Sequence, residues 1–140
     1  MALPFFEVIE HPADVGFRAY GATLEELFAH AGLAMMSLAY ELEGVEERKR
    51  REIEASGADT ESLFYAWLAE LLAIADAEHL VFCRVEVTQL GEGQVRGLAY
   101  GEKFDKGRHR AGTYVKAVTY HQLRVEQTPE GWCGQVYLDV

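Results

Sequence analysis

Apolar residues at helical spacing predict two helices in this chain. Over residues 24–39 they recur every three to four positions, and Thr23 with Glu26 three residues later forms a capping box. Asp59 or Thr60 is expected to cap a second helix that ends near Glu78. A wide apolar stripe marks it as the main core helix and consists of Leu63, Phe64, Trp67, Leu68, Leu71, Leu72 and Ala75.

Alternating apolar and polar residues predict strands in the rest of the chain. The first two are expected at 5–9 and 15–20, joined through the turn His11-Pro12-Ala13-Asp14. After the second helix, strands are expected at 80–90, at 95–104, around Lys116 and at 132–140. The order β-β-α-β-α-β-β-β-β predicts an α+β fold. In it, two helices pack on largely antiparallel sheet within one domain of residues 1–140.

The strand expected around Lys116 covers residues 112–121 and continues the alternation to Val125. It places Val115, Ala117, His121, Leu123 and Val125 on one face, and Tyr114, Lys116, Val118 and Tyr120 on the other. A lysine between two tyrosines is an unusual feature of a strand face. Either its stem covers apolar surface while its ammonium reaches water, or it has a function.

Charge and cysteine content narrow the possible partners. The formal net charge is −10, which disfavours nonspecific binding to nucleic acid or anionic lipid and fits a hard cation or a basic partner better. No apolar run approaches the length of a membrane span, and Met1-Ala2-Leu3-Pro4 lacks the features of a secretory signal. Cys83 and Cys133 lie far apart, which favours reduced thiols in a cytoplasmic protein.

The densest positive charge is the run Arg48-Lys49-Arg50-Arg51 within residues 45–55. A nucleic-acid patch is one interpretation of this run. Because glutamates bracket it and nearly cancel its charge, an exposed edge strand protected by its charges is favoured.

Acidic groups near the end of the sequence suggest a cation site. Asp139 is adjacent to the α-carboxylate of Val140, and two carboxylates this close repel each other. If the turn that carries Asp14 lies at the same end of the sheet, three hard oxygen donors converge. Such a set suits Ca²⁺, Mg²⁺ or Mn²⁺. The alternative is that Asp139 is an exposed terminal residue and Asp14 caps a turn.

The other titratable candidates leave the chemistry open. His11 could be a ligand, a base or a turn residue, whereas His121 is expected on the core face of its strand. Glu25 lies in the first turn of a helix, where the helix dipole favours a carboxylate in any case. The sequence contains no nucleophile elbow, phosphate loop, HExxH or EF-hand pattern. The residues alone therefore identify no reaction.

Three motifs in a fixed order resemble the archease family over essentially the whole chain. Residues 11–28 resemble its opening, which is usually His-Thr-Ala-Asp-Val, with Pro12 in place of the common threonine. Residues 115–121 resemble its second signature, and Leu138-Asp139-Val140 its terminal aspartate with one aliphatic residue. The middle also agrees, in the helix segment 68–72 and in Gly101-Glu102 with Asp105 and His109.

The resemblance implies a non-enzymatic accessory protein. Archeases activate the RNA ligase that joins 3′-phosphate or 2′,3′-cyclic-phosphate ends to 5′-hydroxyl ends in tRNA splicing and RNA repair, by promoting its guanylylation and multiple turnover. By this resemblance Asp14, Asp139 and Val140 bind a divalent metal ion such as Ca²⁺, and Glu25 and Lys116 occupy functionally important positions. His11 and His121 lie within the matching motifs and are further candidates for contact with a partner or nucleotide.

Two other classes of function stay open at this point. One is a small metal-dependent phosphoesterase with His11 or His121 as general base. The other is a chaperone-like or RNA-binding module that uses residues 48–51 or Arg108-His109-Arg110. The net charge of −10 disfavours strong direct binding of nucleic acid.

Overall fold

The protein folds into two antiparallel sheets with two helices between them. The computed structural model describes residues 5–11 and 14–140. In chain order the elements are β1 (Phe6–His11), β2 (Asp14–Gly21), α1 (Leu24–Ala39), β3 (Lys49–Ser56), α2 (Thr60–Glu78), β4 (Leu80–Gly91), β5 (Gln94–Lys103), β6 (Ala117–Val118), β7 (Arg124–Thr128) and β8 (Gly131–Asp139). The predicted α+β class is confirmed.

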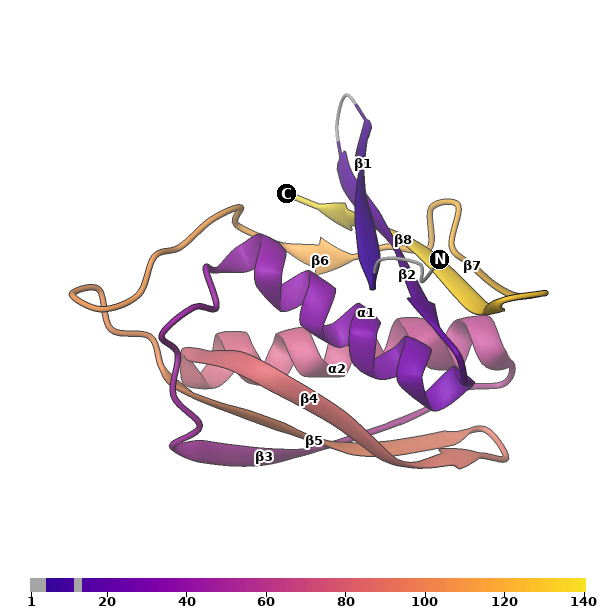
Figure 1. The fold of residues 1–140 in the computed structure, drawn as a ribbon, viewed down its shortest axis with the longest axis horizontal. Helices are drawn as coiled ribbons and strands as arrows, with labels where there is room; N and C mark the ends of the chain where they lie inside the picture. The colour runs from indigo at the N-terminus through magenta and orange to yellow at the C-terminus, as the bar shows by residue number, and fades with distance from the viewer. Residues whose placement is uncertain (1–4, 12–13) are drawn as a thin grey trace.

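The two sheets enclose the helices as the outer layers of the molecule (Figure 1). One sheet has the order β1-β2-β8-β6, and β7 also pairs with β8; the other has the order β3-β5-β4. Helix α1 contacts β2 in the first sheet and β4 in the second, so it bridges the two layers. The sequence predicted antiparallel sheet against two helices but did not separate the strands into two sheets.

Both helices begin where the sequence predicts, because each N-cap satisfies backbone donors. Thr23 Oγ1 accepts a hydrogen bond from Glu26 N at 3.1 Å, and Glu26 Oε1 accepts one from Ala22 N at 3.1 Å. Asp59 Oδ1 accepts from Ser62 N at 2.8 Å in a reciprocal capping box at the start of α2. Caps of this kind each stabilise a helix by about 1 kcal/mol.

The core forms around the apolar stripe of α2. Trp67 is fully buried, and its indole Nε1 donates a hydrogen bond to Phe28 O in α1 at 2.9 Å. The rings of Phe28 and Phe64 meet edge to face, with centroids 5.2 Å apart. Each such buried side chain stabilises the fold by about 1.5–3 kcal/mol, so this helix pair anchors both sheets.

The register of β8 against β2 decides which groups of the first sheet face the helices. Val136 lies opposite Phe17 and Leu138 opposite Val15, and Val136, Phe17 and Leu138 are fully buried. Asp139 is exposed and belongs to the alternate, outward set. The strand predicted at 132–140 is confirmed as β8, although Gln135 and Tyr137 of its outward set are also buried.

The continuous strand predicted around Lys116 is wrong. Only residues 117 and 118 pair with β8, whereas the preceding segment bonds to the end of α1. Gly112 N donates to Ala39 O at 2.7 Å and Thr113 N to Leu38 O at 2.9 Å. These carbonyls belong to the last helical turn and have no partner within the helix, so they draw the segment away from the sheet.

The predicted faces of that segment are wrong for the same reason. Val115 and Val118 are both buried although strict alternation puts them on opposite faces. His121, expected in the core, is exposed. A turn containing Gln122 at φ 50° then separates β6 from β7, which adds one strand to the predicted order.

The charged stretch after α1 is the edge strand that the sequence predicts, but it is shorter. β3 begins at Lys49 rather than near Val45, and it pairs only with β5, at the edge of the second sheet. Ile53 is its fully buried residue, while the flanking charges are exposed. The charges protect this edge from pairing with other chains.

We expect Gly101→Ala to destabilise the protein by about 1–3 kcal/mol through overpacking. A Cβ at Gly101 would collide with Val81 O in the paired strand and lie 2.7 Å from Val81 C. Urea unfolding followed by circular dichroism measures the change. Gly91→Ala is the control, because a Cβ there has no described heavy atom within 4 Å; equal stability of the two variants would contradict the steric explanation.

Candidate functional site

One row of residues across the first sheet contains three of the candidates. The register pairs His11 with Asp14, Asp14 with Asp139, and Asp139 with Ala117. Directly opposed residues project to the same face of a sheet. Asp14 and Asp139 therefore share the outward face, beside the C-terminus and the β1–β2 hairpin (Figure 1).

The two opposed aspartates form a set of hard oxygen donors. Directly opposed side chains have Cβ atoms about 4.5–5.5 Å apart, and like charges in such positions are destabilising. Within the described part of the chain, no group of three or more His, Cys, Asp or Glu side chains is arranged to hold a metal ion. Two aspartates alone are fewer oxygen donors than a hard divalent cation takes.

Lys116 lies beside the same strand end. Its backbone N donates a hydrogen bond to Asp139 O at 2.8 Å, directly before the two-residue pairing of β6 with β8. The Lys116 side chain is exposed. The structure thus brings Asp14, Asp139 and Lys116 to one end of the sheet.

Two exposed tyrosines flank Lys116. Tyr114 is 72% exposed and Tyr120 is 58% exposed. The Tyr120 ring stacks on Tyr65 of α2, with centroids 3.9 Å apart and planes at 16°. Sequence analysis missed Tyr65, because no local pattern indicates which of the seven tyrosines a distant loop will meet.

His121 lies beside Tyr137 of β8. Its ring is 5.6 Å from the ring of Tyr137, at 58° between planes. Tyr137 pairs with Gly16, and a Cβ at Gly16 would lie 2.7 Å from Tyr137 Cδ1. Tyr137 and Asp139 are two residues apart and project to the same face of β8. His11 shares the register row, and its side chain lies outside what the structure describes.

Glu25 is not brought to this site. It is in the first turn of α1, which follows the Gly21 end of β2, whereas Asp14 begins that strand. Seven residues of strand span about 23 Å. Glu25 is exposed at the other end of the sheet. The helix dipole favours a carboxylate in the first turn of a helix, which explains a glutamate at this position.

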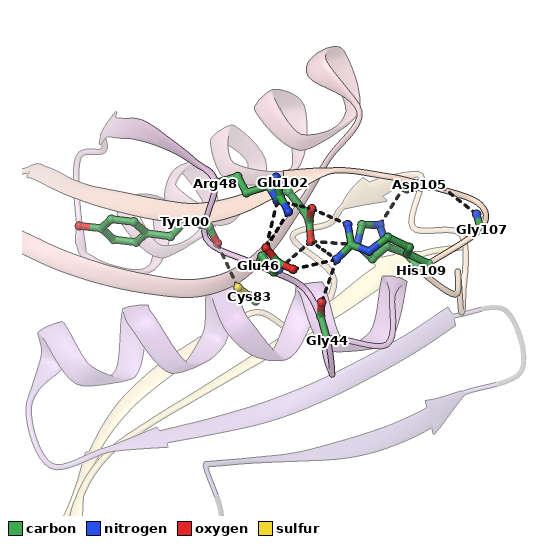
Figure 2. Close-up of polar contacts among 10 residues, drawn as sticks. Gly44, Glu46, Arg48, Cys83, Tyr100, Glu102, Asp105, Gly107 and His109 are labelled. Atoms are coloured by element: carbon green, nitrogen blue, oxygen red, sulfur yellow. Dashed lines mark hydrogen bonds and ion pairs between the residues drawn. The ribbon is translucent and has the colours of Figure 1, made fainter.

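A second polar cluster surrounds Glu102 at the end of β5 (Figure 2). Glu102 is only 4% exposed. Its Oε1 accepts a hydrogen bond from Arg108 Nη1 at 2.9 Å, and its Oε2 accepts from Arg108 Nη2 at 3.1 Å and from Glu46 N at 2.6 Å. This buried carboxylate is fully satisfied.

The same carboxylate also accepts from His109, whose tautomer follows from its contacts. His109 Nδ1 accepts a hydrogen bond from Asp105 N at 2.8 Å, so the ring proton lies on Nε2 and points to Glu102 Oε2 at 3.1 Å. The Arg108 guanidinium lowers the pKa of Glu102 to about 2, with the Glu46 N–H and His109 assisting and burial opposing.

The cluster around Glu102 holds the long connection that leads to Lys116. It joins the segment before β3 to the loop 104–110, and Glu41 N donates to Arg110 O at 3.0 Å. Beyond this point the connection is bonded to the end of α1 through Gly112 and Thr113. The cluster therefore supports the backbone on which Lys116 is presented.

Comparison with known proteins identifies the family. The model of the Archease protein family matches residues 6–140. The chain belongs to the archease family. Protein archease of Pyrococcus furiosus is 42% identical over 139 residues, covering 96% of this chain and 98% of that protein. Protein archease of Methanosarcina mazei is 40% identical over 139 residues, covering 96% and 95%.

Solved structures share the archease fold seen here. The solution structure of protein 1598 from Methanobacterium thermoautotrophicum superposes with a TM-score of 0.86 at 36% identity, covering 97% of this chain and 99% of that one. The crystal structure of an archease from Thermotoga maritima, described as a possible chaperone, has a TM-score of 0.67 at 21% identity, covering 100% and 98%. That second likeness concerns the fold alone. Among the described residues, no helix is long and apolar enough to cross a bilayer.

We expect the stabilising effect of the Glu102 carboxylate to disappear in acid. Its pKa is lowered from 4.5 to about 2 on folding, so the stabilisation is complete above about pH 4.5 and is lost as the pH falls toward 2. The difference in Tm between wild type and Glu102→Gln should be largest at pH 6–7 and shrink steadily below pH 4.5. Thermal unfolding at several pH values measures it.

Glu54→Gln serves as the control for this experiment. Glu54 pairs with Arg96 at 3.3 Å on the surface, where both side chains are 58% exposed, and such pairs contribute little. Its Tm should stay near that of wild type across the same range. A Glu102→Gln difference that does not change with pH would show that shape rather than charge stabilises the cluster.

Proposed function

We propose that this archease activates an RNA ligase of the kind that joins 3′-phosphate ends to 5′-hydroxyl ends, by promoting its guanylylation and multiple turnover. The observation that supports the proposal best is the register pairing of Asp14 with Asp139 beside Lys116. In this proposal the protein catalyses no reaction itself. It presents charged groups to the active centre of the ligase.

A divalent cation such as Ca²⁺, Mg²⁺ or Mn²⁺ is the cofactor in this proposal. Asp14, Asp139 and the terminal carboxylate of Val140 would hold it, because carboxylate oxygens are the donors that hard cations prefer. When bound, the cation supplies positive charge that stabilises phosphate oxygens. It also relieves the repulsion between two carboxylates that the sheet register holds together.

Lys116 supplies the second positive group of the proposed site. Its exposed side chain is available to a triphosphate or to a carboxylate of the ligase. The exposed Tyr114 and Tyr120 on either side provide aromatic surface for the same contact. Tyrosines are enriched at protein interfaces because they bury large area and keep a polar tip.

Two further roles are weaker proposals for this chain. A phosphoesterase would turn over a phosphate ester without any ligase, with His11 or His121 as base. A chaperone-like role is the other alternative, and the Thermotoga maritima archease is described as a possible chaperone. A chaperone needs exposed apolar surface to hold an unfolded protein, and this surface is limited here. The exposed large apolar side chains among the described residues are Phe5, Val8, Tyr114 and Tyr120.

We expect Asp139→Asn to abolish stabilisation by added divalent cations. The wild-type Tm should rise on addition of Ca²⁺, Mg²⁺ or Mn²⁺, because binding to the folded state stabilises it. In chelator the variant should be as stable as wild type or up to about 1 kcal/mol more stable, since the cross-strand repulsion is gone. Thermal unfolding with and without each ion measures both effects.

Glu130→Gln is the matched control for cation binding. It also removes one negative charge, but from the exposed turn that precedes β8, at the opposite end of that strand from Asp139. It should retain the full Tm shift. One residue appended after Val140 tests the terminal carboxylate, and an unchanged shift in that variant would remove Val140 from the ligand set.

We expect Asp14→Ala, Asp139→Ala and Lys116→Ala each to reduce stimulated ligase guanylylation about tenfold or more, the loss when an interaction worth roughly 1.4 kcal/mol is removed. Formation of the covalent ligase–guanylate in the presence of GTP and the archease is the measurement. Arg124→Ala, on β7, is the control. Full stimulation by all three site variants would refute the proposal.

A further inference from the structure

The fold brings two distant basic segments together. Eight of the thirteen Lys and Arg residues lie in only two stretches, residues 48–51 and 103–110. The pairing of β3 with β5 sets Lys49 opposite Gly101. The end of β5 therefore carries the second stretch directly beside the first.

Side chains from both segments line one open depression of about 590 Å³. Its lining is mostly cationic and consists of Arg48, Lys49, Glu102, Lys103, Phe104, Asp105, Lys106 and Arg108. The two acidic members are both engaged. Glu102 is the buried carboxylate bonded by Arg108, and Asp105 Oδ1 accepts a hydrogen bond from Gly107 N at 2.9 Å.

Two of the five cationic side chains in this depression are held by carboxylates, and the other three are exposed lysines. Arg48 Nη2 lies 2.9 Å from Glu46 Oε2 (Figure 2). Arg108 is held by Glu102, so both guanidiniums are positioned. Lys49, Lys103 and Lys106 are exposed. Their flexible ammonium groups can adjust to the phosphates of an extended ligand.

The nearby glutamates cancel less of this charge than the sequence suggests. Glu47 is bonded by Arg84 through both of its oxygens, at 3.0 and 2.9 Å, and Glu54 pairs with Arg96. Glu78 is bonded by Arg51 at 2.7 Å. These carboxylates already have cationic partners outside the depression. Glu46 instead pairs with Arg48 and Arg108 of the depression itself, so its exposed lysines set the local field.

The net charge of −10 does not prevent an anion from binding here. At physiological ionic strength the Debye length is about 8 Å, so charges elsewhere on the surface are largely screened at this point. A single strand that crosses the depression is therefore affected mainly by the charges that line it.

We infer that this depression binds the phosphate backbone of single-stranded RNA. The inference rests on the proposed function, in which the ligase holds an RNA end close to its activator. Basic side chains spread over an open surface suit phosphates repeated along a strand, and partly exposed Phe104 offers aromatic surface to a base. A shorter acidic peptide is the competing occupant.

The test is the affinity of the full-length protein for a fluorescently labelled single-stranded RNA 12-mer, measured by anisotropy without ligase. Lys103→Gln/Lys106→Gln should bind at least about fivefold more weakly at 50 mM salt. Its slope of log affinity against log salt should be shallower by about 1.4, the value for two lost contacts with a single strand. Thermal unfolding checks that the variant is folded.

Arg96→Gln/Arg124→Gln is the matched control, because it removes two exposed positive charges outside the depression. It should keep the wild-type affinity and slope. Equal losses in the two double variants, or an unchanged slope in the lysine variant, would overturn the inference. So would displacement of the RNA by a poly-glutamate peptide at equal concentration of charges, which would identify an acidic protein segment as the ligand.

The outcome can be separated from that of the proposed function. The RNA measurement contains no ligase, and the guanylylation measurement contains no RNA. Loss of stimulation in the Asp139→Ala variant with unchanged RNA affinity supports two separate surfaces. RNA affinity that depends on Asp139 rather than on Lys103 and Lys106 would contradict the assignment to the depression.

Discussion

The pairing of β2 with β8 is the constraint on which the candidate site depends. It joins residues more than a hundred positions apart, and its register is set by burial, because Phe17, Val136 and Leu138 fill the inner face. A slip of β8 by one residue would turn Val136 and Leu138 outward and Asp139 inward. Burying three such side chains contributes several kcal/mol, whereas opposed carboxylates cost at most about one. The core therefore holds Asp14 and Asp139 together despite their repulsion.

The long connection after β5 is positioned by polar groups rather than by a sheet. Residues 104–116 contain little regular structure, yet hydrogen bonds hold them at successive points, first at Glu102 and then at the last carbonyls of α1. The buried carboxylate keeps its negative charge because Arg108, the Glu46 N–H and His109 donate to it. If residues 104–116 formed an unbonded loop, ordering them when Lys116 binds a partner would cost a large amount of conformational entropy. The bonded loop has already lost most of that freedom on folding.

The sequence predicted the parts of the fold that local chemistry decides. The two helices, their caps and the edge position of β3 follow from short patterns of residues. The strand around Lys116 was wrong because unpaired carbonyls of α1, distant in sequence, competed for its backbone donors. The residues raised the partnership of Asp14 with Asp139 as a hypothesis that the family resemblance also implies, and only the register of the sheet places them opposite each other. The stack of Tyr120 on Tyr65 had no local signal.

The distribution of charge over the fold shows why composition alone does not identify a function. A formal net charge of −10 describes the whole surface at long range, but binding depends on the field within about one Debye length. In this fold the acidic pair lies at one end of the first sheet, and the basic depression lies at the end of the second. The connection 104–116 runs from one to the other. A ligand that carries both cations and phosphates, such as a protein bound to RNA, matches this separation of charge better than either component alone.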